Sequence, residues 1–225
     1  RSLRCGDIAV VTNKLPEYAG ILEHSMQRYG IPYHLDMAKP VLHTPFMVYL
    51  MSIMGLLKKR TLDTELLLRC GKSGFTDCTL TEMAELENYS YIWSVDGKMW
   101  NVPFTCGKEC EKAEAVRQKL LYPVIRLKEL CKECITGADH SRKVYEFLAE
   151  QNMGVRAAAM LDEADIGKQQ QMKQDFKRVW ESLMDILDVL AFLYDEEKCT
   201  TSEYFTLLHS MLRSVSHSVP PRTLD

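Results

Sequence analysis

Most of the chain repeats apolar residues every three or four positions, the spacing that places them on one face of an α-helix. Helices are predicted for residues 15–29, 44–57, 62–70, 80–93, 109–135, 139–152, 172–194 and 201–212. Two of them begin with capping-box spacing, at Thr79-x-x-Glu82 and Thr200-x-x-Glu203. Pro123 lies inside another, so we expect that helix to kink or split near Tyr122. The body of the protein is therefore predicted to be α-helical.

The first 36 residues follow a different pattern. Residues 7–12 and 31–35 are short apolar runs typical of buried strands, and the helix predicted for residues 15–29 lies between them. A strand, a helix and a strand in this order predict a βαβ unit with parallel strands. Two strands cannot form a stable parallel sheet alone. Because the chain also lacks an initiator Met, we expect it to be a piece of a longer protein.

Composition and charge narrow the class of protein. With 46% hydrophobic and 26% charged residues in 225, the chain is typical of folded globular proteins. No apolar run approaches the roughly 20 residues that span a bilayer, and no signal peptide is visible. We interpret the eight cysteines as reduced thiols and expect a cytoplasmic protein with no membrane partner. Because the net charge is -3, any binding to nucleic acid must depend on a local patch.

Two features are candidates for contacts with DNA. Lys58, Lys59 and Arg60 form the only run of three cations, at the end of a predicted helix. Such a run either complements the helix dipole or contacts phosphates. An aromatic segment at residues 89–104 contains Trp93 and Trp100, which either belong to the core or stack on bases. The predicted DNA-binding residues are Lys58, Lys59, Arg60 and Trp100.

No complete catalytic or metal site is visible in the sequence. Gly71-Lys72-Ser73 lacks the earlier glycine of a phosphate loop, because position 66 is leucine, and it is interpreted as a helix end. Two cysteine pairs, Cys106 with Cys110 and Cys131 with Cys134, have spacings that resemble a four-thiolate zinc site. Since the second pair lies within a helical pattern, buried structural cysteines are favoured. No catalytic residue or metal ligand is predicted. The alternative is a zinc site formed by these four cysteines.

Several short motifs resemble known helicase families. A first set of motifs resembles the segment that opens the second motor domain of UvrD/Rep-like superfamily 1 helicases. These motifs are residues 7–11, 29–33, 39–40 and 48–53. In those helicases this segment leads into a helical accessory insertion. A second set of motifs resembles the B subunit of the bacterial ATP-dependent helicase/nuclease, the AddB/RexB type of protein. These motifs are residues 86–89, 100–105, 120–123 and 220–225. The resemblance covers nearly the whole chain, and its motifs occur in a specific order.

The resemblance implies a domain organisation. Residues 1–36 would be a short βαβ piece of a RecA-like motor domain, and residues 37–215 a helical accessory domain. Residues 216–225 would return toward the motor domain. The expected fold class is therefore mainly α.

The resemblance also implies a function. The chain would be a non-catalytic central fragment of a helicase/exonuclease B subunit that acts in double-strand break repair and recombination. It would guide single-stranded DNA and contact the A subunit. The parent hydrolase would use ATP and magnesium, whereas the fragment would need no cofactor. Asn13 stands where these helicases usually carry an arginine that helps hold ATP. Two alternatives remain open: a helical protein–protein interaction module with no DNA role, and a thiolate metalloprotein.

Overall fold

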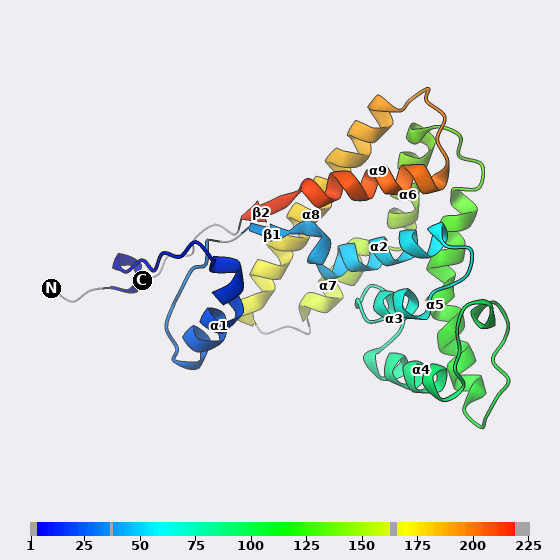
Figure 1. Ribbon diagram of the computed structural model, residues 1–225, viewed down its shortest axis with the longest axis horizontal. Helices are drawn as coiled ribbons and strands as arrows, with labels where there is room; N and C mark the ends of the chain where they lie inside the picture. Colours follow the sequence, from blue (N-terminus) through cyan, green and yellow to red (C-terminus); the bar gives the residue numbers. More distant parts are fainter. Residues whose placement is uncertain (1–3, 37, 163–165, 219–225) are drawn as a thin grey trace. The chain divides into compact units, whose positions relative to one another are not determined.

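The computed structural model describes residues 4–36, 38–162 and 166–218 of the chain. These residues belong to two compact units (Figure 1). The larger unit is Val41–Val215, and the smaller one contains the described parts of Arg1–Pro40 and Ser216–Asp225. No helix in the described ranges combines the length and the apolar composition needed to cross a membrane.

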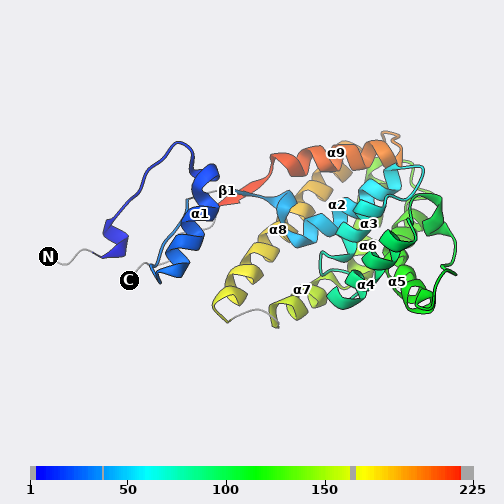
Figure 2. The same cartoon turned by 60° about the horizontal axis from the view of Figure 1, so that its bottom comes forward.

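The larger unit is built from helices joined by short connections (Figures 1 and 2). They are η2 (Val41–His43), α2 (Pro45–Lys58), α3 (Thr64–Gly71), α4 (Leu80–Ile92), η3 (Lys98–Asn101), α5 (Cys110–Leu130), α6 (Gly137–Glu150), α7 (Met153–Asp162), α8 (Ile166–Leu193) and α9 (Thr201–Ser214). The predicted α-helical body is thus confirmed. α7 is an additional helix that the apolar spacing did not reveal.

Helix α2 lies in the core of the larger unit. Eight of its fourteen residues are buried, and the helix packs against α3, α5 and α9. A helix that is apolar on nearly every face is stable only when other helices cover it. The predicted Thr44-Pro45 start is confirmed, since Thr44 is the N-cap and Pro45 the first helical residue.

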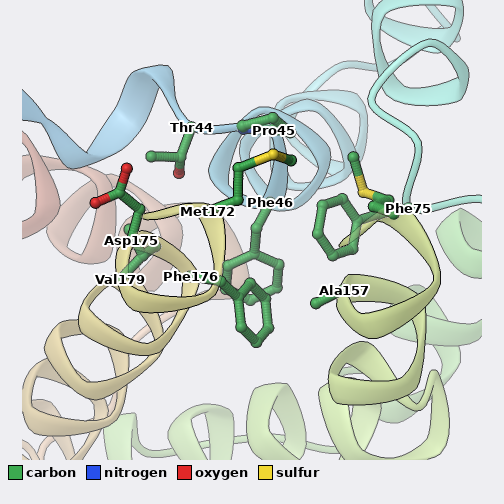
Figure 3. Close-up of a pocket in the computed structure, with 10 residues that line it drawn as sticks. Thr44, Pro45, Phe46, Phe75, Ala157, Met172, Asp175, Phe176 and Val179 are labelled. Carbon is green, nitrogen blue, oxygen red and sulfur yellow. The ribbon is translucent and has the colours of Figure 1, made fainter. Parts of the chain in front are cut away.

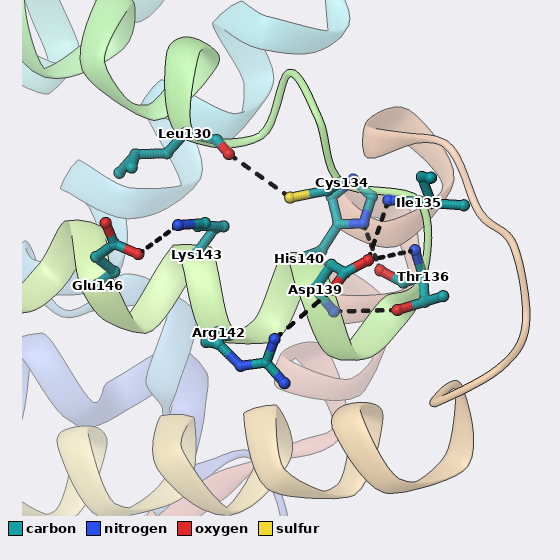
Figure 4. A network of polar contacts seen from close by, with 9 residues as sticks. All are labelled: Leu130, Cys134, Ile135, Thr136, Asp139, His140, Arg142, Lys143 and Glu146. Carbon is teal, nitrogen blue, oxygen red and sulfur yellow. Dashed lines mark hydrogen bonds and ion pairs between the residues drawn. The ribbon is translucent and has the colours of Figure 1, made fainter.

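Capping boxes begin α4 and α9 as predicted, and a third one begins α6. At α4, the Thr79 hydroxyl accepts a hydrogen bond from the Glu82 amide at 3.2 Å. The Glu82 carboxylate accepts one from the Thr79 amide at 2.7 Å. In α6 the cap is Thr136, and Asp139 is the third helical residue rather than the start (Figure 4). The Asp139 carboxylate points back toward the Thr136 amide at 3.2 Å.

We expect Thr79→Ala to lower the free energy of unfolding by about 1 kcal/mol, because the Glu82 amide loses its acceptor. Thr81→Ala is the matched control, since Thr81 is an exposed residue inside the same helix. Urea denaturation followed by circular dichroism compares the two variants. Equal stabilities of both variants would contradict the role of this cap.

Helix α5 differs from two predictions, one about a break at its proline and one about where it ends. It is a single helix from Cys110 to Leu130 that contains Pro123, so of the predicted kink or split near Tyr122 the split is wrong. Pro123 and its neighbour Val124 are buried, and their packing outweighs the missing backbone hydrogen bond. The helix also ends at Leu130 rather than near residue 135, which places Cys131 and Cys134 in the turn before α6.

The smaller unit contains the predicted helix at residues 15–29 but not the predicted strands. The helix is α1 (Leu15–Arg28). Residues 8–12 and 31–35 form no strand, and the side chains of Val10 and Val11 are 72% and 90% exposed. Strands of a parallel sheet hydrogen-bond only to neighbouring strands, and the described residues of this unit offer none beside these segments. The predicted βαβ piece is therefore not formed here.

The strands that the smaller unit does contain are short and antiparallel. They are β1 (Ala38–Pro40) and β2 (Ser216–Ser218), with Ala38 opposite Ser218. β2 begins where the helical pattern was expected to end. The remainder of the predicted return segment lies outside the described residues.

Candidate nucleic-acid interface

Lys58, Lys59 and Arg60, here called the cationic corner, are all exposed at the end of α2. Lys58 Nζ donates a hydrogen bond to the Thr206 hydroxyl of α9 at 2.8 Å. Lys59 forms an ion pair with Asp63, the N-cap of α3, and this hydrogen bond lowers the pKa of the Asp63 carboxyl. Arg60 forms no hydrogen bond or ion pair within the described part of the chain. The corner thus lies where α2, α3 and α9 meet, with Arg60 available to a ligand.

A polar face of α9 adjoins the cationic corner. Thr206, His209, Ser210 and Arg213 are exposed at helical spacing and form what we call the α9 polar face. The hydrogen bond from Lys58 joins Thr206 to the corner although 148 residues separate the two in sequence. Cations are common contacts to phosphate oxygens, whereas the hydroxyls of Thr206 and Ser210 donate to carbonyls of α9 itself. The sequence analysis missed this face, because no local pattern signals a contact over such a separation.

Trp100 does not have the role that the sequence analysis assigned to it. Its side chain is fully buried, and its indole Nε1 donates a hydrogen bond to the Thr64 hydroxyl at 2.8 Å. A ring without an exposed face cannot stack on a base, so the prediction for Trp100 is wrong. The exposed tryptophan of the same segment is Trp93, which is 42% exposed.

The segment between α4 and α5, residues 94–109, is anchored to α5 by a partly buried ion pair. Arg117 donates to both oxygens of Glu114, at 2.7 and 2.6 Å, and to the Trp100 carbonyl at 2.7 Å. The Glu114 carboxylate also accepts a hydrogen bond from the Phe104 amide at 2.9 Å. The hydrogen bonds from Arg117 are the main reason that the pKa of Glu114 falls to about 2. The anchored segment is therefore a fixed surface feature.

The anchored segment lies beside the chain that follows the cationic corner. Leu62 pairs with Gly97 in an antiparallel bridge, and the Thr64 hydroxyl donates to the Val95 carbonyl at 3.0 Å. Arg60 is two residues from this bridge, and the exposed Lys98 is next to it. The fold thus brings the predicted cations close to the aromatic segment. Trp100, however, is buried there and offers no exposed ring.

The four cysteines of the alternative zinc site are not brought together. Cys106 and Cys110 lie at the start of α5, whereas Cys131 and Cys134 follow its end. Helix α5 has 21 residues, so it separates the pairs by about 30 Å. The described residues contain no group of three or more His, Cys, Asp or Glu arranged to hold a metal ion. Burial raises the pKa of the Cys131 thiol to about 12, as expected for a structural cysteine.

The residues of the rejected phosphate loop form a helix end, as predicted. Gly71 is the last residue of α3 and Lys72 is its C-cap. Lys72 Nζ forms an exposed ion pair with Glu87 of α4 at 2.6 Å. This arrangement joins α3 to α4 and forms no loop that could surround a phosphate.

An apolar pocket of about 240 Å³ lies between the start of α2, helix α7 and helix α8 (Figure 3). The rings of Phe46, Phe75 and Phe176 line it, with centroids of Phe46 and Phe176 5.4 Å apart. Thr44 and Asp175 lie at its edge (Figure 3). Because its lining contains no Lys or Arg, this pocket offers nothing that attracts a phosphate.

Comparison with known proteins identifies relatives along the entire chain. No family model matches the sequence. A protein of Alkaliphilus oremlandii is 26% identical over 243 residues, one of Clostridium botulinum (strain Hall) is 27% identical over 241, and one of Clostridium novyi is 24% identical over 227. Each is named as the B subunit of an ATP-dependent helicase/deoxyribonuclease, and each alignment covers 100% of this chain.

The aligned region is only part of each relative. The chain spans 21%, 21% and 20% of the lengths of these three proteins, or about a fifth. This share is consistent with a fragment of a longer protein, as the sequence motifs indicated. The resemblance to the B subunits of ATP-dependent helicase/deoxyribonucleases is thus confirmed over the whole chain.

Proposed function

We propose that this chain is a non-catalytic part of a bacterial helicase/nuclease B subunit that guides single-stranded DNA during double-strand break repair and recombination. The observation that carries the proposal is the similarity of the whole chain to proteins named as such B subunits. The cationic corner beside the α9 polar face supports it, because the two together present the cations Lys58, Lys59, Arg60 and Arg213 to solvent.

The proposal extends to partners and cofactors. The relatives are named as one subunit of an assembly, and we infer that the parent protein contacts an A subunit. ATP and magnesium would act in parts of the parent other than this chain. The proposed place of action is the cytoplasm.

The charges of the corner suit a local phosphate contact. The net charge of -3 opposes a long-range attraction to DNA, so only short-range contacts can provide affinity. Lys58 is bonded to a neutral hydroxyl, which a phosphate oxygen can replace or share at little electrostatic cost. Arg60 adds a guanidinium suited to bidentate phosphate binding. Lys59 would supply a third contact if it exchanged its ion pair with Asp63 for a phosphate. Three contacts imply weak binding whose affinity falls as the salt concentration rises.

We expect the salt dependence of binding to oligo(dT) to have a slope of about -2 in log affinity against log salt, because each single-strand phosphate contact contributes about -0.7. The variant K58Q/K59Q/R60Q should lose most of this slope. Glutamine is preferred over glutamate, because a carboxylate at position 59 would repel the adjacent Asp63. Fluorescence anisotropy at several salt concentrations measures both proteins.

The matched control is K128Q/K132Q/R142Q, which removes three exposed cations at another place on the larger unit. Its slope should equal that of the unmodified chain, since the net charge changes equally in both variants. Equal slopes for all three proteins would contradict the assignment of the DNA site to the cationic corner.

The second candidate function is a helical protein–protein interaction module with no DNA role. The apolar pocket favours it, because a cavity lined by aromatic rings can accept an apolar side chain of another protein (Figure 3). Absence of any salt-dependent binding to oligo(dT) would favour this function over DNA guiding.

A further inference from the structure

We propose that Trp93 is the residue that stacks on a base of the bound strand, next to the phosphates held by the cationic corner. This inference rests on the proposed function, because it names the base contact of the same DNA surface. It replaces the stacking role that the sequence suggested for the buried Trp100.

The indole of Trp93 contacts Tyr89 and the segment around Gly107. Its ring centroid lies 6.4 Å from that of Tyr89, and the backbone of Gly107 approaches it closely. A methyl group on Gly107 would lie only 3.0 Å from Cζ2 of Trp93, and the φ of +79° at this glycine also disfavours other residues. Trp93 is nevertheless 42% exposed, so part of this side chain is accessible to solvent. A ring fixed in this way loses little conformational entropy when a base stacks on it.

The support behind Trp93 is itself rigid. Tyr89 stacks on Phe104 with centroids 4.9 Å apart, and its hydroxyl donates to the Cys106 carbonyl at 2.9 Å. Phe104 in turn packs on the buried Trp100, with centroids 5.5 Å apart. Trp93 is therefore the outermost ring of an aromatic series that extends from the core to the surface.

Cations lie near the start of the anchored segment, which directly follows Trp93. Lys98 is exposed next to Gly97, which pairs with Leu62, and the cationic corner ends two residues before Leu62. Gly97 is four positions after Trp93, which is a reach of at most about 15 Å, a span of a few nucleotides. Exposed rings beside cations are the composition of surfaces that bind single strands without sequence preference. The charge of the corner thus favours a nucleic acid over an apolar protein partner here.

The experiment measures binding of the 225-residue chain to oligo(dT) by anisotropy and by tryptophan fluorescence. We expect Trp93→Ala to weaken binding about tenfold without changing the salt slope, because no phosphate contact is lost. Trp93→Phe keeps a ring, so it should bind within about threefold of the unmodified chain. It should also lose the fluorescence quenching that oligo(dT) causes. Ile92→Ala is the matched control, since Ile92 is 69% exposed but has no ring to stack.

The outcomes separate this inference from the proposed function. If the chain binds with the expected salt slope but Trp93→Ala binds as well as Ile92→Ala, the stacking role is overturned and the DNA-guiding function stands. Equal weakening by both variants would indicate a general apolar contact and would also overturn it. If the unmodified chain does not bind oligo(dT), both the inference and the proposed function fail. Retained quenching in Trp93→Phe would assign the stacking to another residue.

Discussion

Trp100→Ala is expected to lower the free energy of unfolding by about 3 to 5 kcal/mol. The side chain is the largest of those that are fully buried in the described residues, so its removal leaves a large cavity between α3, η3 and α5. The substitution also removes the hydrogen bond from the indole to the Thr64 hydroxyl, which connects α3 to the anchored segment. Urea denaturation of the purified chain measures the loss.

Met99→Ala is the control for Trp100→Ala, because Met99 is the adjacent residue and is 45% exposed. It should cost less than about 1 kcal/mol, as most substitutions on the surface do. Trp100→Phe, which keeps an aromatic ring, should give an intermediate loss. A stability of Trp100→Ala equal to that of Met99→Ala would show that this ring is not part of the core in solution.

Arg117→Ala is expected to cost about 3 kcal/mol, because it leaves the Glu114 carboxylate without its main partner. The side chains of Arg117 and Glu114 are only 10% and 16% exposed, so water replaces little of the lost interaction. Arg126→Ala is the matched control, since Arg126 forms a similar pair with Glu150 in which the side chains are 32% and 35% exposed. The control should lose much less stability than Arg117→Ala, because water screens this more exposed pair.

The pH dependence of stability checks the same ion pair. The pKa of Glu114 is about 2 in the folded chain and about 4.3 in an unfolded one. The stabilisation is therefore fully present above the unfolded value and is lost as the pH falls toward 2. The difference in stability between the unmodified chain and Arg117→Ala should shrink between about pH 5 and pH 2. A difference that stays constant over this range would contradict the role of the Glu114 charge.

The sequence predicted the helices because their signals are local. The capping box at Thr79 and Glu82 is formed by residues three positions apart, and the apolar spacing of α2 or α9 is visible within a few turns. Such patterns operate wherever the helix is located in the molecule. The failure at Pro123 has the opposite cause. Whether a proline splits a helix depends on how well its neighbours pack, and only the core around α5 decides this.

Strands could not be predicted in the same way, because a strand needs a partner. Residues 7–12 have the composition of a buried strand, yet the described chain provides no neighbour for them, and Val11 remains 90% exposed. The pairing that does occur joins residues 38–40 to residues 216–218. Contacts over such sequence separations follow from the tertiary fold and not from local pattern.

For the candidate interface, the sequence by itself determined that Lys58, Lys59 and Arg60 follow an apolar helix, which is why they reach the surface. Only the tertiary structure decided what surrounds them. It placed Thr206 of α9 against Lys58, and it buried Trp100 while leaving Trp93 exposed. Both tryptophans lie in the aromatic segment of residues 89–104, so the local composition does not distinguish them. Trp100 is bonded to Thr64 of α3 and to Arg117 of α5, whereas Trp93 contacts Tyr89 and Gly107. The burial of Trp100 therefore depends on residues distant in sequence, which no local pattern reveals.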